Sequence, residues 1–94
     1  MVALVTPMTA TGDIDVNALL GLVEWHCDAG TDAIVIAGST GEAATLTAEE
    51  RALLIRETVR QVKGRIPVIA GTGTNSTKST VELTRQAKDA GADA

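Results

Sequence analysis

The sequence is poor in aromatic side chains, because Trp25 is its only aromatic residue and it contains neither tyrosine nor phenylalanine. Aromatic side chains usually supply much of the buried area of a core or an interface. A chain of 94 residues forms at most one small domain, with a limited core. We therefore expect that further parts of the protein lie outside this sequence.

Other scarcities narrow the class of protein. The single cysteine, Cys27, excludes an internal disulfide framework and is typical of a reducing compartment. No apolar run has the length that a bilayer requires, and no secretory signal pattern is present. The net charge is -4 and the basic residues are scattered, which argues against a nucleic-acid or membrane-surface partner. We expect a cytoplasmic protein.

Three short apolar runs alternate with three amphipathic segments. The runs cover residues 2–5, 33–36 and 66–70, are rich in β-branched side chains, and end at proline or near glycine. A continuous apolar run of this kind is typical of a parallel strand that is buried on both faces.

The amphipathic segments predict three helices. A capping box formed by Thr47 and Glu50 marks the start of the second helix, and the third covers about residues 77–90. Gly30, Gly64 and Gly91 are expected to end the three helices. The predicted buried stripes are Val16, Leu20, Val23 and Cys27; Ala52, Ile55, Val59 and Val62; and Thr80, Leu83, Ala87 and Ala90.

The order of elements is β-α-β-α-β-α, which predicts parallel strands joined by right-handed crossovers, an α/β fold. The DAGTDA sequence of residues 28–33 resembles the DAGADA sequence of residues 89–94. Both follow a helix, so residues 92–94 should begin a fourth strand. Because three parallel strands cannot close a barrel, we expect an incomplete part of a larger sheet.

Candidate ligand-binding loops follow each strand, at residues 6–15, 37–46 and 71–76, since ligands of α/β folds collect at the carboxyl ends of strands. The GSTGE sequence of residues 38–42 places two hydroxyls between glycines, which suits a small carboxylate or phosphate. An ordinary glycine turn before a helix is the alternative. Residues 71–76 match a dinucleotide loop only in part, because Ser76 replaces its third glycine.

The remaining polar residues favour structural roles. His26 has no second ligand at metal-binding spacing, so we expect a packing or surface role and no metal site. Cys27 should be a small buried apolar residue, and Glu42 should cap a helix or form a salt bridge. The lysines lie on helices or their ends, away from strand termini, so none is a good Schiff-base candidate. They are Lys63, Lys78 and Lys88.

Three segments together resemble the dihydrodipicolinate synthase family, within the N-acetylneuraminate lyase superfamily. They are ALVTPM (residues 3–8), GSTGEAATL (residues 38–46) and RIPVIAGTG (residues 65–73). The resemblance implies a (β/α)8 TIM barrel. Residues 1–94 would then be the first three βα units, the N-terminal part of a single barrel domain.

The resemblance also implies a reaction and two site residues. Family members condense pyruvate, held as a lysine Schiff base, with aspartate semialdehyde in lysine and diaminopimelate biosynthesis; they need no cofactor and are commonly tetramers. Thr40 matches the residue that binds the pyruvate carboxylate. Ser39 matches a hydroxyl in a proton relay with two tyrosines, where threonine is commoner. The Schiff-base lysine and both tyrosines lie outside this chain, so residues 1–94 alone should be inactive.

Some family members are inhibited by lysine, and Ala44 and Asn75 match positions that contact it. In sensitive members these positions carry histidines and an acid. Here they carry Ala48, Arg51 and Ser79, so we expect weak inhibition by lysine.

Two alternative functions stay open. One is a pyruvate-dependent sugar-acid aldolase or lyase, which differs in its aldehyde. The other is an anion-binding α/β module without enzymatic activity.

Overall fold

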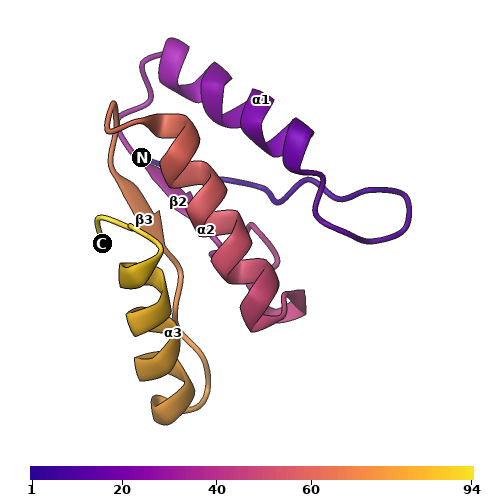
Figure 1. Cartoon of the computed structure of the whole chain (residues 1–94), viewed down its shortest axis with the longest axis vertical. Coiled ribbons are helices and arrows are strands. Elements are labelled where there is room, and N and C mark those ends of the chain that lie inside the picture. The colour runs from indigo at the N-terminus through magenta and orange to yellow at the C-terminus, as the bar shows by residue number, and fades with distance from the viewer.

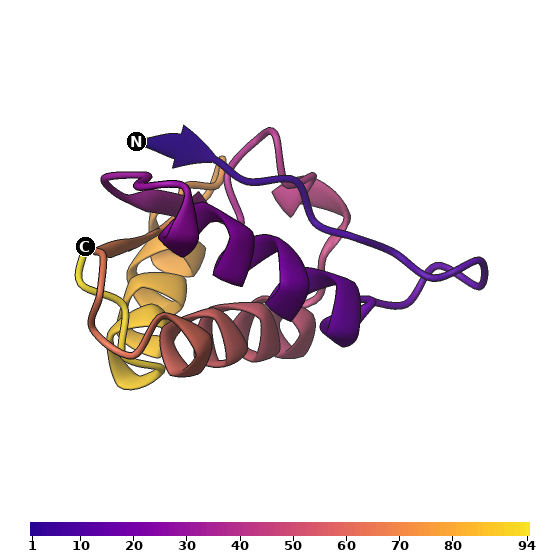
Figure 2. The same cartoon turned by 90° about the horizontal axis from the view of Figure 1, so that it is seen from above.

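The computed structural model describes residues 1–94 as a parallel sheet with its helices on one face (Figures 1 and 2). The elements are β1 (Val2–Ala3), α1 (Val16–Asp28), β2 (Ile34–Ile36), the short 3-10 helix η1 (Ala43–Thr45), α2 (Ala48–Val62), β3 (Val68–Ala70) and α3 (Thr77–Asp89). The predicted β-α-β-α-β-α order is therefore confirmed, with strands shorter than the apolar runs that contain them.

The strands pair in chain order, β1-β2-β3, and both pairs are parallel. Beyond α3, the chain lies along the free edge of β3. The Asp93 amide donates to the Val68 carbonyl over 2.8 Å, and the Ala70 amide donates to the Ala94 carbonyl over 2.8 Å. These bonds place the segment beside β3, but residues 92–94 form no strand and the sheet has three strands, so a fourth strand near residue 92 stays a prediction.

Only one face of the sheet is covered. Val2, Ile34 and Val68 are paired across the three strands, and the latter two are buried beneath the helices. Their neighbours on the opposite face are more accessible, since Ala3 is exposed and Ile69 is half-buried. Within residues 1–94 the helices pack on one side of the sheet alone, and the other face of β1 is open (Figure 2).

The core lies between the sheet and α1 and α2. Its 11 buried apolar residues are Leu4, Leu19, Val23, Ile34, Ile36, Ala37, Leu54, Ile55, Val62, Val68 and Ala87. The predicted stripe of α1 omitted Leu19, which is fully buried, and that of α2 omitted Leu54. Each helix thus turns a slightly different face inward than the spacing alone indicated. In α3, only Ala87 is buried.

Local signals set the helix ends as expected. The Thr47 hydroxyl accepts from the Glu50 amide over 3.1 Å and the Glu50 carboxylate accepts from the Thr47 amide over 3.0 Å, which confirms the capping box. Gly30 and Gly91 follow α1 and α3 with positive φ. After α2, Lys63 itself is left-handed, ahead of Gly64. No helix combines the length and the apolar character that crossing a membrane requires.

Candidate functional site

The loops that follow the three strands meet at the carboxyl end of the sheet. The middle loop, residues 38–41, leaves β2 through Ala37, which is buried and left-handed with φ 55°. Glu42, at the other end of the loop, is also left-handed with φ 58°. Non-glycine residues adopt this conformation rarely and at some cost, so the surrounding structure must hold the loop in place.

Hydrogen bonds within the loop supply part of that support. The amides of Gly41 and Ala43 both donate to the Gly38 carbonyl, over 3.1 and 3.3 Å, and the Glu42 amide donates to the Ser39 carbonyl over 3.0 Å. The loop is thus a compact turn that leads directly into η1.

The first loop holds the middle loop through Thr6. Its buried hydroxyl donates to the Gly41 carbonyl over 2.7 Å. A Cβ at Gly41 would lie 3.0 Å from the Thr6 hydroxyl oxygen and 3.1 Å from the Leu4 carbonyl oxygen, so the close approach favours glycine. β1 and the middle loop therefore form one packed unit.

The third loop closes on the middle loop at Gly71. The Gly71 amide donates to the Ile36 carbonyl over 2.8 Å. A Cβ at Gly71 would lie 2.3 Å from the Ala37 carbonyl oxygen, a distance that no side chain tolerates. Backbone thus packs on backbone here.

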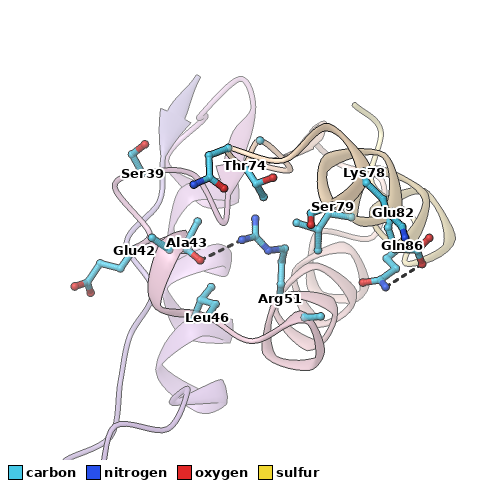
Figure 3. A pocket seen from close by; sticks show the side chains of 15 residues that line it. Ser39, Glu42, Ala43, Leu46, Arg51, Thr74, Lys78, Ser79, Glu82 and Gln86 are labelled. Carbon is cyan, nitrogen blue, oxygen red and sulfur yellow. Dashed lines mark hydrogen bonds between the residues drawn. The ribbon is translucent and has the colours of Figure 1, made fainter.

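On this support, Ser39 and Thr40 are exposed. Neither of their backbone amides donates to a backbone carbonyl, and neither hydroxyl takes part in any of the side-chain hydrogen bonds that hold the neighbouring loops. Figure 3 shows Ser39 at the rim of a cavity beside this loop. The loop therefore presents free donors on a constrained backbone, the arrangement that a small carboxylate requires.

The cavity beside the loop has a volume of about 910 Å³ and lies between η1, the start of α2 and the start of α3. The structure brings together here all five residues that the sequence assigned to a second site. They are Ala44, Ala48, Arg51, Asn75 and Ser79. Thr40 does not line this cavity, so the two predicted sites are neighbours that share only Ser39 at the rim.

Arg51 is buried in the wall of the cavity, a fact that the stripe predicted for α2 missed. Its guanidinium donates to the Gly71 carbonyl over 2.6 Å and to the Ala43 carbonyl over 3.1 Å (Figure 3). It therefore bridges the second and third loops, while burial lowers its pKa. The sequence did carry a signal, because Arg51 stands at helical spacing before Ile55, Thr58 and Val62, which are all buried.

The structure corrects the interpretation of Glu42, which caps no helix with its side chain and forms no ion pair. Residues 71–76 act as a structural turn. The Thr74 hydroxyl donates to the Ser76 carbonyl, and the Ser76 hydroxyl accepts from the Ser79 amide as the cap of α3. The partial dinucleotide pattern is thus explained by turn and cap formation.

The other residues lie largely where the sequence placed them. His26 is half-buried and its Nδ1 is 2.9 Å from the Thr31 hydroxyl, which confirms a packing role. Cys27 is half-buried against the core, less covered than predicted. The three lysines are exposed on helices or their ends, with Lys78 lining the cavity beside Arg51.

Comparison with known proteins gives one consistent result. The model of the dihydrodipicolinate synthetase family matches residues 1–94. The 4-hydroxy-tetrahydrodipicolinate synthase of Saccharophagus degradans is 61% identical over 94 residues, which are 100% of this chain and 32% of that protein. The chain thus spans about a third of the length of the curated relatives it matches.

Solved structures agree. Dihydrodipicolinate synthase from Acinetobacter baumannii, described as chloride inhibited and complexed with pyruvate, superposes with a TM-score of 0.95 at 54% identity over 97% of this chain and 31% of that one. The Aquifex aeolicus enzyme gives a TM-score of 0.94 at 52% identity over 98% and 31% of the two chains. The predicted fold, consecutive βα units of this barrel family, is confirmed.

Proposed function

We propose, from the premise that this chain belongs to the dihydrodipicolinate synthetase family, that its complete protein is a lyase that condenses pyruvate with aspartate semialdehyde. The product would be 4-hydroxy-tetrahydrodipicolinate, in lysine and diaminopimelate biosynthesis. Residues 1–94 would form the N-terminal part of a single barrel domain, in a cytoplasmic homotetramer. No cofactor is needed for this chemistry.

The observation that carries the proposal is the pair of free hydroxyls at the end of β2. Thr40 would hold the pyruvate carboxylate with its hydroxyl and amide, since charge-assisted hydrogen bonds to a carboxylate are the stronger kind. Ser39 would pass a proton between the substrate and two tyrosines elsewhere in the protein. Serine keeps the donor and acceptor of the commoner threonine and loses only the methyl group that restricts its rotamer.

The chemistry itself would use a lysine beyond these residues. Its amine adds to the pyruvate ketone and water leaves, giving an imine. Loss of a methyl proton gives the enamine, whose carbon attacks the aldehyde carbon, while the aldehyde oxygen takes up a proton. The amine of aspartate semialdehyde then attacks the imine carbon, which closes the ring and releases the lysine amine. Thr6, Gly41 and Gly71 support this step indirectly, because they fix the backbone that carries Ser39 and Thr40.

The alternatives find less support. A sugar-acid aldolase would share the pyruvate step, but relatives at 60% and 61% identity carry the synthase name. A non-enzymatic module would have to share the GSTGE loop with these synthases for a reason other than the reaction.

Ala44 and Asn75 are proposed to lie in a regulatory site. Ser79 stands there in place of an acid and leaves a lysine ammonium without an acidic partner, so we expect inhibition by lysine to be weak.

The test is to incubate the product of the complete gene with pyruvate and borohydride and to measure its intact mass. We expect a covalent pyruvate adduct. Thr40→Val should raise the KM for pyruvate by about tenfold or more, the effect of losing a hydrogen bond to a charged group. Thr77→Val is a matched control on exposed α3 and should leave KM unchanged. A folded protein that forms no adduct would refute the proposal.

A further inference from the structure

The Arg51 side chain contacts the backbone on both sides of the middle loop. Its guanidinium donates to the Ala43 carbonyl over 3.1 Å (Figure 3) and to the Gly71 carbonyl over 2.6 Å. Ala43 begins η1, directly after the loop turn, and Gly71 follows β3. The donor and both acceptors lie within residues 43–71, so these bonds do not depend on other parts of the complete protein.

The bond to Ala43 acts on the end of the loop. The Ala43 amide donates to the Gly38 carbonyl over 3.3 Å, so this residue is held at its amide by the start of the loop and at its carbonyl by Arg51. Ser39 and Thr40 lie between these two points. The guanidinium therefore helps to keep closed the turn that carries both hydroxyls.

The bond to Gly71 acts on the beginning of the loop. The Gly71 amide donates to the Ile36 carbonyl over 2.8 Å. Gly71 also packs directly on Ala37, because a Cβ at Gly71 would lie 2.3 Å from the Ala37 carbonyl oxygen. Ala37 leads straight into Gly38. By fixing Gly71, Arg51 thus keeps the backbone in place where it enters the middle loop.

Each bond of Arg51 lies next to one of the two strained residues. Glu42, with φ 58°, precedes Ala43, and Ala37, with φ 55°, lies against Gly71. A non-glycine residue keeps this conformation only where its surroundings hold it. The guanidinium is planar and presents its donors in a rigid fork, so one side chain can fix both carbonyls at a set separation. Arg51 therefore opposes the relaxation of both strained residues.

We propose that Arg51 is a positioning residue for pyruvate, which acts through the backbone that carries Ser39 and Thr40. The inference rests on the proposed function, in which Thr40 binds the pyruvate carboxylate. Arg51 acts without touching the substrate. If Ala37 or Glu42 relaxes, the peptide groups between them turn and the two hydroxyls move with them. Since a displacement of about 1 Å can lower a rate by about 10²-fold, loss of Arg51 should weaken pyruvate binding as well as stability.

Arg65 provides the matched comparison at the amino end of the sheet. Its guanidinium donates to the carbonyls of Gln61 and Val62, over 2.7 and 2.8 Å, and to both oxygens of the Glu24 carboxylate. These bonds tie the end of α2 to α1, at the opposite end of the sheet from the middle loop. Loss of Arg65 therefore removes comparable backbone contacts without releasing that loop.

The test uses the complete protein and measures the pyruvate concentration that gives half-maximal trapping by borohydride, read from the intact mass. Arg51→Met keeps an unbranched side chain but removes every donor. It should raise this concentration by about tenfold or more and lower the thermal midpoint. Arg65→Met should lower the thermal midpoint and leave the half-maximal pyruvate concentration unchanged.

Arg51→Met risks unfolding, because two carbonyls lose their donor. Arg51→Lys retains a cation and N–H donors without the fork, so its half-maximal pyruvate concentration should lie between those of the wild type and Arg51→Met. A folded Arg51 variant with the wild-type value would overturn the proposal. Equal shifts in Arg51→Met and Arg65→Met would also overturn it, because a general loss of stability would then explain both. A wild type that forms no adduct would refute the proposed function and, with it, the role of Arg51 toward pyruvate.

Discussion

The two ends of the sheet differ in how completely their polar groups are satisfied. At the amino ends of the strands, Glu24 of α1 accepts two hydrogen bonds from Arg65 and one from Gln61, all between 2.7 and 2.8 Å. At the carboxyl ends, the hydroxyls of Ser39 and Thr40 are free and the Arg51 Nε has no acceptor. The polar groups at the amino end are paired within the protein, whereas the exposed hydroxyls of Ser39 and Thr40 at the carboxyl end remain available for ligands, which bind at this edge in parallel α/β folds.

Backbone conformation shows the same contrast. Ala37 and Glu42, two of the three non-glycine residues with positive φ, flank the middle loop at the carboxyl end. The turns at the amino end rely mainly on glycines such as Gly30 and Gly91, which adopt positive φ without cost. The carboxyl end thus stores strain that close backbone packing must hold.

The largest expected effect comes from breaking that packing with Gly71→Ala. The added Cβ would lie 2.3 Å from the Ala37 carbonyl oxygen, with only backbone around it to move. We expect the free energy of unfolding of the complete protein to fall by about 3 kcal/mol or more, in the range of severe overpacking. Denaturant unfolding followed by circular dichroism measures the change.

Gly73→Ala is the matched control, because a Cβ at Gly73 meets nothing within 4 Å. It should change stability by less than about 1 kcal/mol. Similar losses in both variants would mean that the third loop is sensitive throughout, and the packing of Gly71 on Ala37 would not be the cause.

Most of the architecture could be predicted from the sequence, since it depends on local signals. The Thr47 and Glu50 capping box, the helix stops at Gly30 and Gly91, and the repeated DAG sequence all depend on nearby residues. The site was only partly predictable. The GSTGE motif indicated free hydroxyls, but the bonds from Thr6 to Gly41 and from Arg51 to Gly71 join segments far apart in sequence. No periodicity reports such contacts.

A smaller effect should follow from loosening the middle loop with Thr6→Val. The change keeps the shape of the buried side chain but removes the donor to the Gly41 carbonyl, 2.7 Å away. Leaving that buried acceptor unpaired should cost about 1–3 kcal/mol, measured by thermal unfolding. If the loop binds pyruvate, the KM for pyruvate should rise as well.

Thr6→Ser is the control, because it retains the hydroxyl, and it should recover most of the stability and of the KM. A Thr6→Ser protein as impaired as Thr6→Val would show that the hydroxyl is not responsible.

The smallest effect is expected at the amino end, where Glu24→Gln removes the charge that pairs with Arg65. The Arg65 hydrogen bonds lower the pKa of Glu24 from 4.5 to about 2. A carboxyl with a depressed pKa in the folded state stabilises the protein above its unfolded pKa, and that contribution is lost as the pH falls from about 4.5 to about 2. The thermal midpoints of wild type and Glu24→Gln should therefore differ slightly at pH 7 and converge across this range, and added salt should reduce the difference. Glu57→Gln, whose partner Arg60 lies 3.7 Å away on the same helix, serves as the control for a single long ion pair. If the thermal midpoints stay equally separated down to pH 2, the effect of Glu24→Gln comes from packing. The ion pair with Arg65 would then not be what stabilises the amino end of the sheet.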